Sequence, residues 1–376
     1  MDFQLSEEEA IIQETVRNLA QEKFVPRAAE IDAKSLWPEK NLRELAELGL
    51  LGTILDERYG GASASTMSYS VTLEEIAKAC ASTSVITSVT TMVGLAIQRE
   101  GSEEQKEKWV SKIATGEEIG AFCLTEPSAG SDAGSLKTIA KVEGDTVHIN
   151  GQKLWITNAA HAGIFLVMAN ENPEQGSRGI SAFVVEKGTP GLKINAPEKK
   201  MGLNGSHTSA VFFDDVKVPI DNRIGEKGKG LPIALKSLDT GRIGIASQAL
   251  GIGQAAFDAA VNYSKEREQF GKPIGKFQGV GFRLADMRMK LDAGRLLTRR
   301  AAWMKDQGMK HTVESSIAKA FTTEAAFDIT ASAIRTHGGM GFSKELPVER
   351  YHRDIQATLL YEGTNDIQRI VISRGL

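Results

Sequence analysis

The hydrophobic pattern of this chain changes its period twice, and this change limits the possible folds more than any other feature of the sequence. A capping-box sequence, Ser6 to Glu9, precedes apolar residues at helical spacing, and similar patterns continue to about residue 120. From about Phe122 the pattern alternates as in strands, and Asn150-Gly151 predicts a two-residue hairpin turn. Long helical patterns return after GEKGKG. We therefore expect a mainly α protein with an N-terminal helical domain (1–121), a central β-barrel or sheet domain (122–228) and a C-terminal helical bundle (229–376).

The charge of the chain excludes several classes of partner. Its 376 residues include 45 Lys and Arg against 48 Asp and Glu, which gives a net charge of -3. This near balance provides no general attraction for nucleic acid or for an anionic membrane. No uninterrupted apolar run reaches the roughly 20 residues that cross a bilayer. The acidic start, MDFQLSEEE, lacks a basic targeting region, so we expect a cytoplasmic protein.

Several common chemistries have no sequence support. The chain contains no GxxxxGK[ST] phosphate loop, no GxGxxG fingerprint after a strand, no HExxH and no GxSxG. The six histidines show no paired ligand spacing, so we expect no metal site. Cys80 and Cys123 are too far apart for CxxC chemistry and too few for a disulfide framework. We expect each cysteine to be a small buried apolar residue in a protein of a reducing compartment.

Three glycine-rich or polar segments interrupt apolar surroundings and could carry a site. They are CLTEPSAGSDAGS (123–135), HGGMGF (337–342) and YEGTNDIQR (361–369). Small residues let backbone N–H groups approach a ligand, above all its phosphates or carbonyls. Each segment taken alone could also be an ordinary turn.

Individual side chains in these regions leave two interpretations open. Glu362 follows the apolar ATLLY, where burial would raise its pKa and make it a general base, but it could also be a surface or helix-capping carboxylate. Trp155 could be a core residue or the stacking wall of an aromatic ligand. Asp239 and Arg242 lie in a long apolar helix, where buried pairing and anion binding are equally compatible with the pattern.

Taken together, the segments resemble the acyl-CoA dehydrogenase family over essentially the whole chain. Five segments match in order: CLTEPSAGSDAGS, KLWITNA, REQFGKPIGKFQ, HGGMGFSKELPVERYHRD and LLYEGTNDIQR. Within the family, LDTGRIGIASQALGIGQAAFDAAVNY looks most like the short-chain, butyryl-CoA type. The resemblance implies the three domains with a C-terminal four-helix bundle, FAD, a short-chain acyl-CoA substrate, an electron-transferring flavoprotein as oxidant and a homotetramer built as a dimer of dimers.

The resemblance also implies roles for particular residues. Glu362 is similar to the base that removes the α-proton while the β-hydride passes to flavin N5, and Gly241 leaves it as the base that the family supports. The family's substrate residues correspond to Ser131, Asp239, Arg242 and Gly363. Its FAD contacts within one subunit correspond to Phe122, Leu124, Thr125, Gly130, Ser131, Trp155, Ile156, Thr157, Thr364, Asn365 and Asp366. Those from a neighbouring subunit correspond to Arg267, Phe270, Gln278, Arg335, Gly338 and Gly339, where Arg335 replaces the family's frequent Gln.

Three alternatives to this hypothesis follow from the same residues. A short branched-chain acyl-CoA is the nearest rival substrate. An oxidase of the same fold would pass electrons to oxygen, and peroxide production with butyryl-CoA would reveal it. A catalytically inactive flavin- or CoA-binding protein is disfavoured because Glu362, Trp155 and Thr157 are all present.

Overall fold

The N-terminal third of the chain is helical. A computed structural model describes residues 4–376; the first three residues of the acidic start lie outside the described part. The predicted capping box is confirmed: the Glu9 N–H donates to Ser6 Oγ (3.2 Å) and the Ser6 N–H donates to Glu9 Oε2 (2.9 Å). The helices of this part are α1 (Glu7–Leu19), α2 (Val25–Lys34), α3 (Glu39–Glu47), α4 (Thr66–Ala79), α5 (Ala81–Glu100), α6 (Glu103–Gln105) and α7 (Ser111–Ala114).

An eight-stranded sheet follows, with strand order β6-β7-β3-β2-β4-β5-β8, and β1 pairs in parallel with β4. Its strands are β1 (Gly120–Cys123), β2 (Ile139–Glu143), β3 (Thr146–Thr157), β4 (Ile164–Asn170), β5 (Ile180–Glu186), β6 (Leu192–Ile194), β7 (Thr208–Pro219) and β8 (Arg223–Ile224). β4 is buried along its whole length, and its side chains enter two hydrophobic clusters. One cluster is shared with the N-terminal helices, so the sheet and these helices pack as one body.

The hairpin predicted at Asn150-Gly151 is wrong. β3 continues through both residues, and the turn lies earlier, between the paired Glu143 and Thr146. Gly151 instead marks a bulge in the pairing of β3 with β7, where a Cβ would lie 2.5 Å from Thr138 Oγ1. The glycine therefore permits close approach of two strands, a role that the dipeptide pattern cannot distinguish from a turn.

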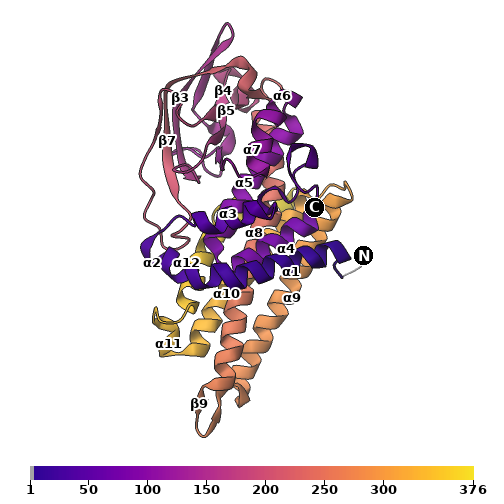
Figure 1. The fold of residues 1–376 in the computed structure, drawn as a ribbon, viewed down its shortest axis with the longest axis vertical. Coiled ribbons are helices and arrows are strands. Elements are labelled where there is room, and N and C mark those ends of the chain that lie inside the picture. The colour runs from indigo at the N-terminus through magenta and orange to yellow at the C-terminus, as the bar shows by residue number, and fades with distance from the viewer. Residues whose placement is uncertain (1–3) are drawn as a thin grey trace.

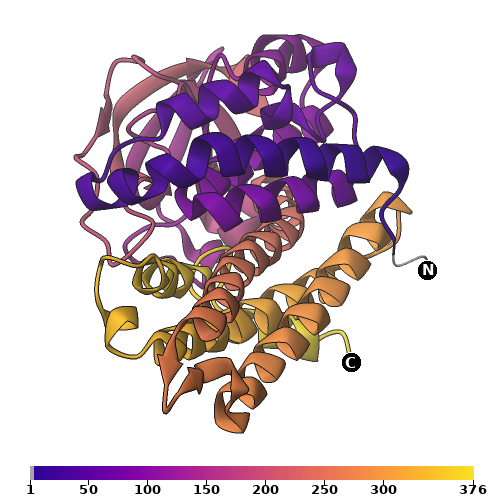
Figure 2. The same cartoon turned by 60° about the horizontal axis from the view of Figure 1, so that its bottom comes forward.

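Long helices form the C-terminal part. They are α8 (Gly230–Glu266), α9 (Gln278–Asp306), α10 (Thr312–His337), α11 (Gly339–Phe342), α12 (Val348–Thr358) and α13 (Asn365–Ser373), and the short strands β9 (Glu268–Gln269) and β10 (Lys272–Pro273) join α8 to α9. α8 packs against α10, α9, α4 and α5. Figure 1 places the sheet at one end of the molecule and the β9–β10 hairpin at the other. In Figure 2 the N-terminal helices lie across the long C-terminal helices, which confirms the expected fold class.

The central helix α5 is the one described helix that is long and apolar enough to cross a membrane. Of its apolar stretch of 18 residues, 89% is buried inside the protein, where α5 packs against α8, α4 and β1. This is the behaviour of a core helix. Cys80 and Cys123, on either side of α5 in the sequence, are both buried free thiols, as expected.

Candidate active site

Glu362 lies in a tight left-handed turn between α12 and α13. Its φ is 54° and that of Gly363 is 86°, and Thr364 is the residue that caps α13 through its side chain. A left-handed glutamate is uncommon, whereas Gly363 adopts this conformation without steric strain. Glu362 is therefore not a helix-capping residue, and the turn directs its side chain back toward the helical bundle.

The carboxylate of Glu362 is buried against α8 without a hydrogen-bond partner. A Cβ added to Gly241 would lie 2.3 Å from Glu362 Oε2, so the glycine makes room for the carboxylate. Oε2 is buried and has no partner among the described residues. Burial raises the pKa of Glu362 to about 7, although the positive charges of Arg242 and Lys319 oppose the shift. Glu362 as a whole is half-buried, but the Oε2 end of its carboxylate is buried inside the protein, so it is not a surface carboxylate.

Asp239 and Arg242 form a buried ion pair on α8, with 2.8 Å between Asp239 Oδ1 and the Arg242 guanidinium. Thr312 donates a hydrogen bond to Asp239, and Ser316 accepts a long one from Arg242, so both partners are tied to α10. The Nε of Arg242 is buried with no hydrogen-bond partner among residues 4–376. Of the two interpretations left open for Asp239 and Arg242, the structure shows the buried ion pair. The Nε–H group of Arg242 remains available to donate to a ligand.

Trp155 stands out of the sheet at a bulge near the end of β3. Its φ is 59°, the residue is 55% exposed, and the pairing of β3 with β7 shifts between Lys153 and Ile156. Asn158 then anchors the strand end to α5 and β1, because its side-chain amide donates to Ile86 O on α5 and to Gly120 O on β1. Trp155 is therefore not a core residue; its indole is held on a rigid edge and is free to stack.

A buried ion pair that the sequence analysis missed holds this edge. Lys153 Nζ lies 2.7 Å from Glu126 Oε1, and both residues are almost completely buried. Glu126 also accepts hydrogen bonds from the backbone N–H groups of Lys137 and Thr138. The pair fixes the loop after β1 to β3. The sequence did contain a signal for this pair, because CLTEP and KLWIT each carry one charged residue among mostly apolar residues.

The other residues predicted near the flavin ring gather around this edge. Phe122 and Tyr361 pack against the same hydrophobic cluster, which joins β1 to the segment of Glu362. The Leu154 N–H donates to Thr125 O, so the loop and β3 lie side by side. Leu124 and Ile156 are buried, while Thr125 and Thr157 are half-buried and Gly130 and Ser131 are exposed. Next to this loop, a cavity of about 610 Å³ is lined by Asp132, Gly134, Ser135, Leu136, Lys137, Ile139, Asn170, Pro173, Gly176 and Ser177.

Two of the residues after Glu362 differ sharply in their surroundings. Asn365 is buried, and its side chain bonds to Thr323, Glu324 and Lys319 on α10. The side chain of Asp366 is 93% exposed. Asn365 is thus engaged inside the protein, and only Asp366 and the capping Thr364 border the solvent side.

The remaining predicted cofactor residues lie far from this site within one chain. Arg267 ends α8, and the Tyr263 ring stacks on His337 at the end of α10, which brings Arg267 and Gly338 to the same end of the bundle. Phe270 lies in the β9–β10 turn and is 94% exposed. Figure 1 shows this hairpin at the end opposite to the sheet. We call the set Arg267, Phe270, Gln278, Arg335, Gly338 and Gly339 the distal cluster, after the position of this hairpin.

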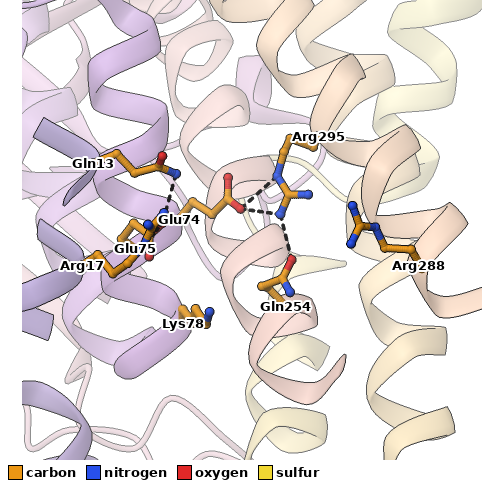
Figure 3. A pocket seen from close by; sticks show the side chains of 8 residues that line it. All are labelled: Gln13, Arg17, Glu74, Glu75, Lys78, Gln254, Arg288 and Arg295. Carbon is orange, nitrogen blue, oxygen red and sulfur yellow. Dashed lines mark hydrogen bonds and ion pairs between the residues drawn. The ribbon is translucent and has the colours of Figure 1, made fainter. Parts of the chain in front are cut away.

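A further pocket, of about 210 Å³, contains none of the predicted residues (Figure 3). It lies between α1, α4, α8 and α9 and is lined by charged and amide side chains. Glu75 accepts from Gln13 and Arg17, while Arg295 donates to Glu74 and Gln254. These charges satisfy one another, so the pocket is a polar junction between the N-terminal helices and the bundle. No group of three potential metal-ligating residues occurs within residues 4–376.

Comparison with known proteins gives a consistent result for sequence and structure. Residues 6–117, 121–216 and 228–376 match the N-terminal, middle and C-terminal domains of acyl-CoA dehydrogenase. A short-chain specific acyl-CoA dehydrogenase of Clostridium acetobutylicum is 43% identical over 374 residues, which cover 99% of each chain. Butyryl-CoA dehydrogenase of Megasphaera elsdenii superposes with a TM-score of 0.98 at 42% identity, covering 100% of this chain and 99% of that one.

Two other solved structures have the same fold. A chain of a structure described as the electron transferring flavoprotein of Acidaminococcus fermentans has a TM-score of 0.99 and 41% identity, with 100% and 99% of the two chains covered. The FAD complex of PigA has a TM-score of 0.96 and 30% identity, with the same coverage. Matches of this extent, to all three domains, show that the chain belongs to the acyl-CoA dehydrogenase family of oxidoreductases.

Proposed function

We propose that this protein is an FAD-dependent dehydrogenase that oxidises short straight-chain acyl-CoA to trans-2-enoyl-CoA, with Glu362 as the base that removes the α-proton. The observation that carries the proposal is the Glu362 carboxylate, buried against Gly241 with Oε2 unpaired. A buried unpaired oxygen is destabilising unless a ligand or a proton satisfies it. An acyl-CoA that places its α-C–H group against this oxygen is a ligand that would meet this need.

The residues at the sheet edge fit a flavin. Trp155 offers an exposed aromatic face at a strained position, and Thr157 beside it offers a hydroxyl. Phe122, Leu124, Thr125, Gly130 and Ser131 would contact the same group from the loop that the Lys153–Glu126 pair fixes. The chemistry that bound FAD supplies is acceptance of the hydride from the β-carbon. The FAD complex of the related PigA supports this assignment.

The environment of Glu362 suits proton abstraction from a thioester. An α-proton of a thioester is far less acidic than a carboxylic acid in water, so the base must be desolvated and the enolate oxygen stabilised. Burial raises the pKa of Glu362 to about 7, which makes it a stronger base than an exposed carboxylate. The left-handed turn at Gly363 keeps the backbone free of side chains where the thioester would lie.

The space beyond Glu362 along α8 supports a short acyl group. Gly244 lies one turn after Gly241 on the same face of α8, about 4.5 Å along the helix axis. A Cβ on Gly244 would lie 2.7 Å from Ser88 Oγ and 2.8 Å from the Tyr69 hydroxyl, and these two groups are hydrogen-bonded. An acyl chain that follows this face would meet their side chains after about one helical turn. The names of the related short-chain and butyryl-CoA enzymes agree with this preference.

The first test is the visible spectrum of the purified protein before and after anaerobic addition of butyryl-CoA. We expect an oxidised-flavin band that bleaches, followed by slower bleaching with each longer straight-chain acyl-CoA. A flavin band that no acyl-CoA bleaches would contradict the substrate class. Protein that binds no FAD, even when FAD is supplied, would contradict the whole proposal. Peroxide formed in air at the rate of substrate use would identify an oxidase instead.

We propose that the distal cluster completes the FAD site of a neighbouring subunit in a homotetramer. The position of the β9–β10 hairpin, which directly follows Arg267, supports this, because it lies at the end of the molecule opposite to the sheet that carries Trp155. Arg267 ends α8 as an exposed guanidinium, a group well suited to bind a pyrophosphate. The related electron-transferring flavoprotein structure supports a flavoprotein as the electron acceptor.

We expect Arg267→Ala to lose FAD on dilution or gel filtration, because the pyrophosphate loses a bidentate partner. The measurement is the ratio of flavin to protein absorbance after purification, with about 10-fold weaker FAD binding expected. Lys265→Ala removes an exposed charge two residues earlier and is the matched control. Full flavin occupancy in Arg267→Ala would overturn the cross-subunit assignment of this residue.

A further inference from the structure

Lys319 on α10 is a completely buried lysine that touches the turn of Glu362. Its Nζ donates to Gly363 O at 2.9 Å and to the Asn365 side-chain oxygen at 2.8 Å. Gln368 donates to Gly363 O as well, at 2.8 Å. The left-handed turn is therefore held from the inside of the bundle by two side chains, and only one of them carries a charge.

The charge of Lys319 is not needed to hold the turn. Both hydrogen-bond acceptors of its ammonium are neutral oxygens, and a neutral amide such as Gln368 binds one of them equally closely. Among residues 4–376 Lys319 forms no ion pair with a carboxylate, although the residue is fully buried. Burying an ammonium without a counter-ion is costly. Burial lowers the pKa of Lys319 to about 7, so its ammonium form depends on a negative charge nearby.

The nearby negative charge is that of Glu362. The two positive charges that act on Glu362 are those of Arg242 from α8 and Lys319 from α10. Arg242 is already neutralised by Asp239 at 2.8 Å, whereas Lys319 has no such partner. The Tyr69 and Tyr361 hydroxyls also feel the charge of Glu362, but burial raises the pKa of both, so they stay neutral. Glu324, on α10 itself, is the other carboxylate that acts on Lys319, and it is paired with Arg369.

We propose that Lys319 is a positioning residue for the base: its ammonium fixes the Glu362–Gly363 turn through Gly363 and Asn365, and its unneutralised charge stabilises the ionised carboxylate of Glu362. This inference rests on the function proposed above. Burial lowers the pKa of Lys319 and Glu362 opposes that shift, as expected for two buried groups of opposite charge. The charge of Lys319 thus favours the ionised form of a base whose pKa lies at about 7, although the carboxylate has no hydrogen-bond donor on Oε2.

The test is the pH dependence of anaerobic flavin reduction by butyryl-CoA in the Lys319→Met holoenzyme. Methionine keeps most of the side-chain volume and removes the charge. We expect the acidic limb of the rate to move to higher pH by about one unit, and the rate at pH 7 to fall about 5-fold, because the ionised fraction of the base falls from about one half to about one tenth. Lys319→Arg keeps a positive charge in altered geometry. The acidic limb of its rate should stay at the wild-type pH while its maximal rate falls. A lower rate with an unmoved limb in Lys319→Met would show a merely structural role and overturn the proposal.

Two further variants separate an effect of the Lys319 charge from a general loss of structure. Lys305→Met removes another largely buried ammonium that is not among the charges acting on Glu362, so its acidic limb should not move. If Lys319→Met fails to bind FAD or to fold, Lys319→Arg becomes the test. An acidic limb that moves to higher pH in Lys319→Arg, although the charge is retained, would contradict the proposal. Wild-type protein whose flavin is not reduced by any acyl-CoA would instead show that the proposed function has failed.

Discussion

Glu362→Gln is expected to lower the rate of flavin reduction by butyryl-CoA about 10³- to 10⁴-fold while FAD and substrate remain bound. The amide has nearly the shape of the carboxylate and cannot accept the α-proton, and a positioned base contributes about this factor. The measurement is anaerobic stopped-flow absorbance of the flavin band at saturating substrate. Binding is checked separately by the spectral shift that a non-oxidisable acyl-CoA analogue causes.

The matched control is Glu324→Gln. Glu324 is a half-exposed carboxylate on α10 that accepts a hydrogen bond from Asn365 and pairs with Arg369, so it lies near the same turn but does not face Gly241. This variant should reduce its flavin within about 3-fold of the wild-type rate, since a surface ion pair contributes little. Rapid flavin reduction by Glu362→Gln would remove the base assignment and leave the family membership intact.

The same base gives the sign of the pH dependence. The pKa of Glu362 is raised to about 7, so below that pH the carboxyl is protonated and the rate of flavin reduction should fall. The stability effect has the opposite direction, because the folded state binds the proton more tightly than the unfolded state. Folding is therefore most favoured by this group below its unfolded pKa of about 4.3, and that contribution is lost as the pH rises through about 7. A rise in pH through about 7 should therefore increase the rate of flavin reduction and decrease the contribution of Glu362 to the free energy of unfolding.

Sequence periodicity was sufficient for the helical and β parts of the fold but not for local backbone geometry. The pattern from Gly230 onward corresponds to one unbroken 37-residue helix, α8. Asn150-Gly151 was misread because a glycine needed for close approach to Thr138 has the same local signature as a turn glycine. The distinction depends on a strand that lies elsewhere in the sequence, so no local rule can supply it.

The candidate site shows the same limit. The apolar residues before Glu362 left both a buried and a surface position open, and its neighbours in space could not be predicted. Lys319 lies in SIAKAF, where one lysine in a helix ordinarily faces solvent, and only the packing of α10 against α13 turns it inward. Likewise, the choice between pairing and anion binding for Arg242 required the position of Asp239 in space. Contacts between separate helices decide the electrostatics of this site.

One face of α9 carries exposed apolar side chains that a single chain leaves uncovered. Phe282, Met289 and Leu296 repeat every seven residues and are 64%, 62% and 48% exposed. Residues seven apart lie on the same side of a helix, and an apolar stripe of this kind is typical of a helix–helix interface. At the same end of the bundle, Phe270 and Phe342 are 94% and 89% exposed. We propose that this surface binds another copy of the chain, which would carry its distal cluster toward a neighbouring flavin.

Met289→Glu combined with Leu296→Glu is therefore expected to dissociate the assembly and to release FAD as a consequence. Two buried carboxylates in an apolar interface each cost several kcal/mol, enough to shift association by about a thousandfold or more. Light scattering coupled to gel filtration would measure the mass, and the flavin-to-protein absorbance ratio would measure occupancy in the same fractions. Ile11→Glu with Leu48→Glu, which changes exposed apolar residues of the N-terminal helices, is the control and should leave both unchanged. A dissociated variant that keeps its FAD would show that one chain suffices for the cofactor, because occupancy would then not depend on the distal cluster of another subunit.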